Sequence, residues 1–303
     1  MKTDDRPNAE LPPGATMTNK LKSAFIGIYP LLAAGIAFYS LRQLYLTKNL
    51  LIWGGPLATS APFLALVGFL MCFRNVARTS ANLPALNLIA VCGLALACYA
   101  VSVDGSNLAP LWLSLCGAVT FFLYSTWYSK LGVPETARLK VGAALPLLDF
   151  IKPDGQRFST EALRGRPALL MFYRGNWCPL CMAQIKEIAA QYREISRFGA
   201  RVLLVSPQPH ANTVALAKRF NVEFDFLTDT GNSAARRLGI EMKSGLPLGM
   251  ELLGYDSDTV FPTVIVVDSN GVIRWVDQTD NYRVRPEPET FLPILRELTA
   301  APG

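Results

Sequence analysis

The sequence ALLMFYRGNWCPLCMAQIKEIAAQYREISRF, residues 168–198, determines the fold of the half of the chain in which it lies. Its first part, Ala168–Tyr173, is a continuous apolar run of strand length, which residues 174–176 (RGN) interrupt. Beyond Pro179, apolar residues recur at helical spacing to the end of the stretch. Because proline is tolerated in the first turn of a helix, the pattern predicts a buried strand, a short loop and one long helix that begins near Cys178.

Two cysteines, Cys178 and Cys181, form a Cys-x-x-Cys sequence at that turn. The N-terminus of a helix carries partial positive charge and unpaired N–H groups, so we expect the pKa of Cys178 to lie below that of a free cysteine. The side chain of Arg174 would act in the same direction. Cys181 is close enough in sequence to attack a mixed disulfide on Cys178. The residues therefore predict a redox pair in which Cys178 is the nucleophile and Cys181 the resolving thiol.

A zinc site and a pair of inert cysteines are the alternatives to this interpretation. A zinc site needs four ligands, usually from two such pairs, and the chain has no second Cys-x-x-Cys and a single histidine, His210. Two inert buried cysteines are the second alternative. A tryptophan, Trp177, directly before the pair and between a strand and a helix, favours the redox role. No glycine-rich phosphate loop follows a strand, so we expect no metal, nucleotide or flavin cofactor.

Residues 172–181, FYRGNWCPLC, resemble the active-site loop of the thioredoxin superfamily. In particular, they resemble the peroxiredoxin-like (AhpC/TSA) proteins with a Tyr-Arg-Gly-x-Trp-Cys-Pro-x-Cys motif, and the resemblance extends over about residues 140–298. It implies an α/β thioredoxin fold of the peroxiredoxin-like type and a Cys178–Cys181 disulfide in the redox cycle. Supporting positions would be Arg174, Trp177 and Pro179.

The resemblance also extends to Phe261-Pro262-Thr263, which looks like the cis-proline element of thioredoxin folds. In that family a cis bond before this proline holds a substrate chain against the nucleophilic cysteine, and Pro262 would be the substrate-side residue. The alternative is an ordinary trans proline at the entrance of a strand.

The chain departs from typical peroxiredoxins, which carry Pro-x-x-x-Thr-x-x-Cys, because Met171 and Gly175 stand at the proline and threonine positions. The hydroxyl that orients a peroxide is therefore missing. An arginine that those enzymes carry near the start of a late strand is also replaced, here by residues 261–263. Arg174 is the residue that could take over its role.

Two chemistries remain open for the pair. The Cys178 thiolate would either reduce a peroxide through a sulfenic acid, or exchange with a protein or small-molecule disulfide. A thioredoxin-like reductant or a protein disulfide is the expected partner. A non-catalytic membrane protein whose thioredoxin fold is a binding module is the alternative from a different class.

The first half of the chain is much more apolar than a soluble domain. Hydrophobic residues make up 51% of the chain and charged residues 17%, and the apolar excess lies before residue 130. Four runs carry no charged residue, and each is long enough to cross a hydrocarbon core of about 30 Å as a helix. The runs are residues 24–41, 50–73, 83–103 and 108–128. They predict four transmembrane helices at residues 24–46, 50–73, 83–103 and 108–128, embedded in a lipid bilayer.

Basic residues of the short loops predict the orientation of these helices. The side that holds both termini carries Lys20, Lys22, Arg74, Arg78, Lys130, Arg138 and Lys140, and the other side only Arg42 and Lys48. We therefore expect a multi-pass protein, of the bacterial inner membrane, with its redox domain in the cytoplasm. Cys72, Cys92, Cys98 and Cys116 lie in apolar runs, where they behave as small hydrophobic residues. The net charge of +6 includes no dense basic run, so nucleic acid is not an expected partner.

The predicted organisation has four parts: a disordered arm at 1–22, a transmembrane region at 23–129, a linker at 130–139 and the redox domain at 140–303. In that domain we expect a hairpin at 145–155, strands at 201–206, 224–229, 264–268 and 272–276, and helices at 212–220, 233–238 and 289–298. Asn270-Gly271 predicts a hairpin turn between the last two strands. Residues 241–260 are an insertion that would either shape a substrate groove or form a tethered surface loop.

Overall fold

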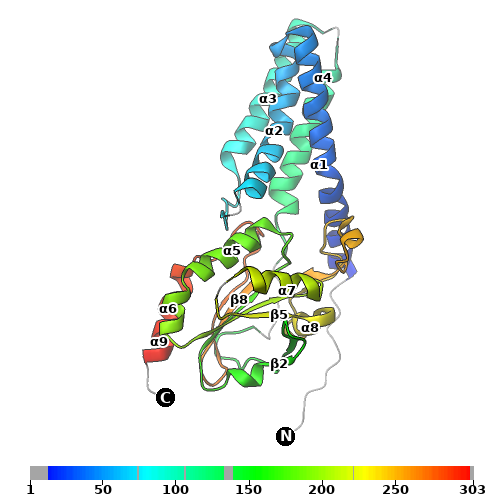
Figure 1. Cartoon of the computed structure of the whole chain (residues 1–303). Coiled ribbons are helices and arrows are strands. Elements are labelled where there is room, and N and C mark those ends of the chain that lie inside the picture. Colours follow the sequence, from blue (N-terminus) through cyan, green and yellow to red (C-terminus); the bar gives the residue numbers. More distant parts are fainter. Residues whose placement is uncertain (1–12, 74, 106, 133–138, 221, 301–303) are drawn as a thin grey trace.

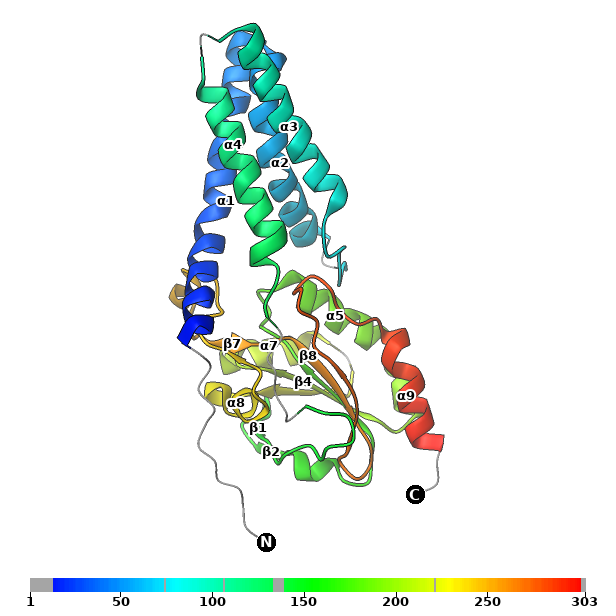
Figure 2. The ribbon, with the colours of Figure 1, turned by 180° about the vertical axis from the view of Figure 1, so that it is seen from behind.

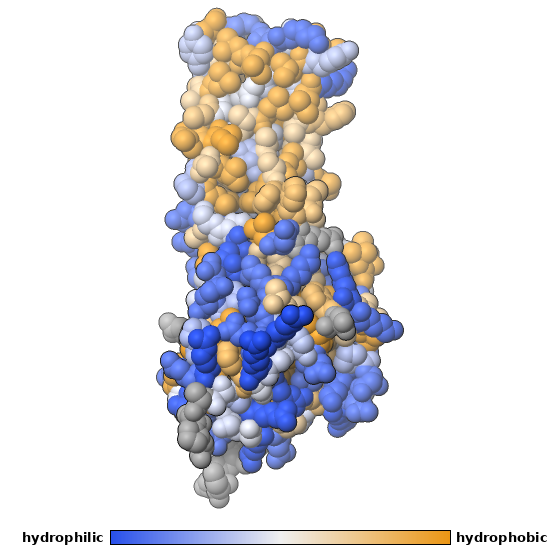
Figure 3. Space-filling view, turned by 60° about the vertical axis from the view of Figure 1, so that its left-hand side comes forward, coloured by the Kyte–Doolittle hydropathy of each residue, from blue (hydrophilic) through white to orange (hydrophobic). Residues whose placement is uncertain are grey.

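A computed structural model of the chain describes residues 13–73, 75–105, 107–132, 139–220 and 222–300. The molecule is elongated, with a bundle of four helices at one end and an α/β domain at the other (Figure 1). On the face that Figure 3 shows, apolar residues cover most of the bundle, whereas the α/β domain is largely polar. The two halves therefore differ in surface character as the composition of the sequence predicts.

The bundle consists of α1 (Pro13–Thr47), α2 (Leu50–Cys72), α3 (Pro84–Val103) and α4 (Ala109–Phe122), and α4 continues as the π-helix η1 (Leu123–Tyr128). By length and composition, all four helices could cross a membrane, with α4 and η1 counted together. Small residues let α2 approach its neighbours closely. A Cβ atom added to Gly55 would lie 2.8 Å from the carbonyl oxygen of Gly93, so no larger side chain fits there.

The first helix begins earlier than the sequence predicts. The predicted disordered arm was wrong for residues 13–22, which are helical, while residues 1–12 lie outside the described part of the chain. The polar start of α1 is stabilised by contacts with the α/β domain, which a local pattern does not reveal: Asn19 Nδ2 donates to the carbonyl oxygen of Lys243 at 3.0 Å. Of the predicted linker, residues 133–138 also lie outside the description.

The α/β domain is built on a seven-stranded sheet in the order β2-β1-β5-β4-β3-β8-β9. The strands are β1 (Asp149–Ile151), β2 (Arg157–Ser159), β3 (Ala168–Phe172), β4 (Arg201–Ser206), β5 (Asp225–Thr228), β8 (Thr263–Val267) and β9 (Ile273–Asp277). Strands β3, β4 and β5 are parallel, and β8 runs antiparallel to β3. The predicted hairpin is β1–β2, and Gly271, with a φ of 78°, occupies the turn between β8 and β9.

Side chains of the central strands alternate between two apolar layers. Leu169 and Met171 of β3 face one layer, and Leu170 and Phe172 face the other. The first layer holds α5 (Pro179–Ala190), α6 (Tyr192–Arg197), α7 (His210–Arg219) and α9 (Pro288–Ala300), and the second holds α8 (Ser233–Leu238). The remaining short elements are η2 (Thr160–Leu163), η3 (Thr230–Asn232), η4 (Met250–Leu253) and the two-stranded β6 (Glu241–Met242) and β7 (Thr259–Val260). This alternation is what the strand period of two requires of a sheet covered on both faces.

The long helix predicted after Pro179 is in fact two helices, because the chain turns at Gln191. The backbone N–H of Gln191 is shared between the carbonyl oxygens of Glu187 and Ile188, at 3.3 and 3.1 Å, which tightens the turn and ends α5. The apolar spacing continues across the break, so the periodicity could not detect it.

One segment joins the two halves of the molecule. Residues 278–287, which we call the docking segment, follow β9 and rise to the lower end of the bundle (Figure 2). Tyr282 N donates to the carbonyl oxygen of Ser129 at 3.1 Å, and its hydroxyl group lies 2.8 Å from that of Tyr124. Arg283 is fully buried, and its guanidinium donates to the carbonyl oxygen of Ala81 at 2.7 Å and to the Ser129 hydroxyl group. A single apolar cluster therefore continues from the bundle into the α/β domain.

We expect Arg283→Ala to lower the free energy of unfolding by about 2–4 kcal/mol, because it removes the hydrogen bonds to Ala81 and Ser129 and leaves a cavity where a fully buried side chain stood. Thermal unfolding of the detergent-solubilised chain measures this as a fall of several degrees in the midpoint. Arg296→Ala is the matched control, since Arg296 forms an exposed pair with Glu194 and its loss should cost about 1 kcal/mol or less. Equal midpoints for the two variants would show that the docking segment does not stabilise the structure.

Candidate active site

Cys178 is the residue directly before the first turn of α5. Its backbone is extended, with φ −85° and ψ 110°, and its carbonyl oxygen accepts the N–H of Met182 at 3.1 Å. Pro179 occupies the first position of the helix, where the missing N–H group of proline costs no helical hydrogen bond. The sequence therefore placed the cysteine correctly at the N-terminus of a helix, where the helix dipole favours a thiolate.

The two cysteines lie together as reduced thiols and are both buried; Cys178 is 2% exposed. A hydrogen bond from the Cys181 thiol to the Cys178 sulfur, together with the charges of Arg285 and Arg174, outweighs desolvation and lowers the pKa of Cys178 to about 6. The same hydrogen bond and burial raise the pKa of Cys181 well above its usual value. At neutral pH the pair therefore consists of a nucleophilic thiolate and a protonated thiol that donates to it.

Arg285, in the docking segment, is the residue that the sequence analysis missed. Its side chain is buried, and its Nε and Nη2 atoms have no hydrogen-bond partner. Of the two arginines that lower the pKa of Cys178, Arg285 has the larger effect, ahead of the expected Arg174. No local pattern marks this position, because the chain separates it from the cysteines by more than one hundred residues.

Arg174 and Trp177 pack against each other beside the pair. The Arg174 guanidinium lies 4.9 Å from the centre of the Trp177 ring, within the range of a cation–π contact. Between them, Gly175 has a φ of 146°, and an added Cβ would lie 2.7 Å from Trp177 Nε1. The tryptophan ring thus occupies the space in which the threonine of a typical peroxiredoxin would stand.

A buried network holds the loop that carries the pair. The amide of Gln208, after β4, accepts the N–H of Asn176 at 2.8 Å and donates to the Tyr173 hydroxyl group at 3.1 Å. The Asn176 side chain in turn accepts the hydroxyl group of Tyr255, from the insertion. Gln208 and Tyr255 could not be found from the sequence either, since both approach the loop from other elements.

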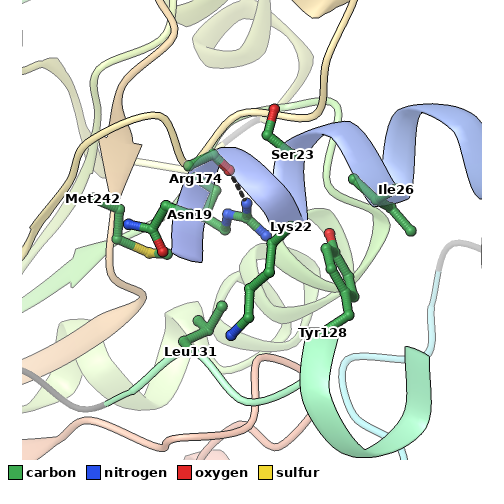
Figure 4. A pocket seen from close by; sticks show the side chains of 9 residues that line it. Asn19, Lys22, Ser23, Ile26, Tyr128, Leu131, Arg174 and Met242 are labelled. Atoms are coloured by element: carbon green, nitrogen blue, oxygen red, sulfur yellow. Dashed lines mark hydrogen bonds between the residues drawn. The ribbon is translucent and has the colours of Figure 1, made fainter. Parts of the chain in front are cut away.

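The lower end of the bundle covers the pair. Tyr128, the last residue of η1, is buried, belongs to the same apolar cluster as Cys178 and lies close to the charge of the Arg174 side chain. Beside it lies a small pocket between the start of α1, the end of η1 and the insertion (Figure 4). The pocket has room for roughly one water molecule, and its charged lining residues are Lys22 and Arg174.

The remaining predicted site residue, Pro262, directly precedes β8. Thr263 pairs with Phe172, so Pro262 lies beside the end of β3 from which the dithiol loop departs. None of the peptide bonds of the described residues is cis, so the cis bond that the resemblance implied was wrong. A trans proline at the entrance of a strand needs no special conformation, and trans is the lower-energy isomer.

The class of protein follows from the sheet and the position of the dithiol. The strands β3, β4 and β5 form a parallel core, an antiparallel β8–β9 hairpin flanks it, and the dithiol lies at the N-terminus of the helix after β3. This is a thioredoxin fold of the peroxiredoxin-like type, with four helices before it.

Comparison with known proteins gives the same assignment. The model of the AhpC/TSA family matches residues 141–276. The chain is 27% identical to "Peroxiredoxin Q, chloroplastic" of Populus jackii over 34% of this chain and 49% of that protein. It is 22% identical to "Putative peroxiredoxin bcp" of Coxiella burnetii, over 45% of this chain and 85% of that protein. A solved structure, peroxidoxin BcpB from Mycobacterium tuberculosis, is 17% identical with a TM-score of 0.45, and the match covers 53% of this chain and 98% of that one.

The α/β domain is therefore similar to the peroxiredoxin-like AhpC/TSA family of the thioredoxin superfamily over most of its length, and the resemblance drawn from the sequence is confirmed. The chain spans about half the length of the plant relatives it matches. The residues that match the family lie after the four helices of the bundle.

The ionisation of Cys178 gives a pH-dependent prediction. Because its pKa in the folded chain is about 6, alkylation of Cys178 by iodoacetamide should rise as the pH passes through about 6 and level off above it. Arg285→Gln should raise the midpoint by roughly 1–2 units, since a facing cation is lost. Peptide mapping by mass spectrometry at each pH measures this, with Arg296→Gln as the control. An unchanged midpoint in Arg285→Gln would mean that Arg285 does not act on the thiolate.

Proposed function

We propose that the protein is a membrane-anchored, thiol-dependent oxidoreductase that reduces peroxides with the Cys178–Cys181 pair. The observation that carries the proposal is the buried pair itself: a thiolate at a helix N-terminus, hydrogen-bonded by a protonated thiol and faced by two arginines. Similarity to the peroxiredoxin-like family supports peroxide as the substrate class.

In the first step, the Cys178 thiolate attacks one oxygen of the peroxide. The O–O bond breaks, the sulfur is oxidised to a sulfenic acid, and the other oxygen leaves as an alcohol or water after taking a proton. The positive charges of Arg285 and Arg174 stabilise the negative charge that moves from the sulfur to the leaving oxygen. Their buried, unpaired N–H groups can donate to that oxygen without first giving up another partner.

In the second step, Cys181 attacks the sulfenic sulfur, an S–S bond forms and water leaves, so that the dithiol has supplied two electrons. A thioredoxin-like reductant then restores both thiols by thiol–disulfide exchange. The hydrogen bond between the two cysteines places them within reach of this reaction.

Thiol–disulfide exchange without peroxidase activity is the second candidate. One observation favours it: the Trp177 ring fills the space beside Gly175, where a peroxiredoxin threonine would orient the peroxide. Against it, Cys178 is only 2% exposed beneath Tyr128, and a disulfide on a protein surface cannot reach a sulfur in that position while the bundle covers it. Burial therefore favours a small substrate over a protein disulfide.

The membrane anchor is the four-helix bundle. Its helices carry exposed large apolar side chains, among them Leu31, Phe38 and Trp112, which would face lipid. The basic residues of the loops favour a cytoplasmic location for both termini and for the redox domain. The dithiol then lies on the cytoplasmic side, directly beneath the bilayer.

Stopped-flow mixing of the reduced full-length chain with hydrogen peroxide tests the chemistry, because Trp177 fluorescence reports on the adjacent pair. We expect a fast second-order phase that Cys178→Ser abolishes. Cys181→Ser should keep this phase but stop at a sulfenic acid that dimedone traps. Cys116→Ser, in the bundle, is the control and should behave as wild type.

Slow oxidation by peroxide together with fast exchange with a protein disulfide would instead establish the second candidate. If the wild-type chain shows neither reaction, and if Cys178→Ser still binds its partner, the protein is a binding module and not an enzyme.

A topology reporter tests the orientation independently. Fused after Gly303, a reporter that is active only in the cytoplasm should be active, and one that is active only in the periplasm should be silent, because loop charges direct the orientation of the helices. The reverse pattern of activities would place the redox domain on the opposite face of the membrane.

A further inference from the structure

The insertion, residues 241–260, is not a free loop but is attached to the first helix of the bundle. Ser23 Oγ donates to the carbonyl oxygen of Leu246, and Leu248 N donates to the carbonyl oxygen of Ser23 at 3.2 Å. Contact is so close that a Cβ atom on Gly27 would lie 2.9 Å from Cβ of Leu248. The insertion therefore has a fixed position beside the lower part of α1, as Figures 1 and 2 both show.

The tip of the insertion exposes large apolar side chains. Leu248, Leu252 and Leu253 are 55%, 91% and 68% exposed, and all three lie in or next to η4. Glu251, between them in sequence, turns its carboxylate back to accept the N–H of Gly249 at 3.0 Å. Three neighbouring leucines on a rigid surface element mark a contact with another apolar phase.

The position of this tip along α1 indicates that the apolar phase is the lipid bilayer. Lys22 and Lys48 lie at the two ends of the membrane-spanning part of α1, with Arg42 six residues before Lys48, and at 1.5 Å per residue the two lysines are about 39 Å apart along the helix axis. That span approaches the thickness of a bilayer with its headgroups, about 40–45 Å. Gly27, which Leu248 contacts, lies about 7–8 Å inward from Lys22, where headgroups give way to acyl chains.

The insertion also contacts the active-site loop. Gly245 provides the carbonyl oxygen that accepts the Arg174 guanidinium, and the Thr259 hydroxyl group donates to the Arg174 carbonyl oxygen at 3.1 Å. Its Tyr255 hydroxyl group donates to Asn176. Whatever fixes the tip of the insertion therefore also fixes the loop that carries Cys178.

We propose that the insertion is a membrane-contacting element, whose Leu248, Leu252 and Leu253 enter the interfacial layer of the bilayer beside α1. This inference rests on the membrane anchoring proposed above, and its partner is the lipid itself. The carboxylates of the insertion, Glu241, Glu251, Asp256 and Asp258, give it an acidic character, so apolar burial drives the contact and attraction to anionic lipid does not.

Fluorescence quenching by brominated lipid tests the contact in the full-length chain. The Leu252→Trp variant is reconstituted in nanodiscs of phosphatidylcholine that carries bromine near the headgroup end of its acyl chains, and in unbrominated nanodiscs. The fluorescence that the new tryptophan adds to the wild-type signal should be blue-shifted and mostly lost in the brominated lipid. Because Leu252 is exposed, its replacement by tryptophan disturbs no packing.

Gln156→Trp is the matched control, in the exposed turn between β1 and β2 at the end of the domain far from the bundle (Figure 1). Its added fluorescence should be red-shifted and unquenched. The wild-type chain tests the membrane anchoring by itself. Trp112 in α4 is exposed on the bundle, so its fluorescence should be quenched by the brominated lipid if the bundle spans the bilayer.

Two results would overturn the proposal. If the wild-type signal is quenched but the added signal of Leu252→Trp behaves like that of Gln156→Trp, the bundle is in the membrane and the insertion is in water. If the added signal is blue-shifted but unquenched, and the shift depends on protein concentration, a second copy of the chain covers the leucines. An unquenched wild-type signal would instead refute the membrane anchoring.

Discussion

A buried thiolate, that of Cys178, lies at the foot of the helical bundle and would not be stable there alone. Burial of an isolated ion costs several kcal/mol, so the thiolate depends on the thiol of Cys181 and on the charge of Arg285. Arg285 is fixed by the docking segment, which Tyr282 and Arg283 attach to the bundle. The electrostatics of the site thus depend on how the bundle and the α/β domain pack together.

The same packing determines what can reach the sulfur. Tyr128 covers Cys178 from the bundle side, and the insertion holds Arg174 from the other. A peroxide is small enough for such a site, whereas reduction by a protein partner requires Cys178 to become accessible. In the proposed cycle, the covered dithiol is therefore the form that meets peroxide.

Local patterns in the sequence predicted most of the α/β domain. Residues 201–206 and 233–238 form the strand and helix that were expected, and Cys178 precedes α5, because strand composition, helical spacing and a first-turn proline act over a few residues. The missed features depend on contacts that are distant in sequence. Arg285 and Tyr128 meet Cys178 only through the fold, and the start of α1 is helical because it packs on the insertion. The cis bond expected at Pro262 came from resemblance alone and is absent from the described peptide bonds.

The central claim is that the bundle covers an ionised Cys178, and the size dependence of its labelling tests that claim most directly. The full-length protein in native membranes is treated at neutral pH with methyl methanethiosulfonate or with a maleimide carrying a long polyethylene glycol chain. We expect the small reagent to modify Cys178 rapidly and the large one to fail until the protein is denatured, with Tyr128→Ala restoring reaction with the large reagent. Equal labelling of Cys178 by both reagents in the wild-type protein would contradict the account.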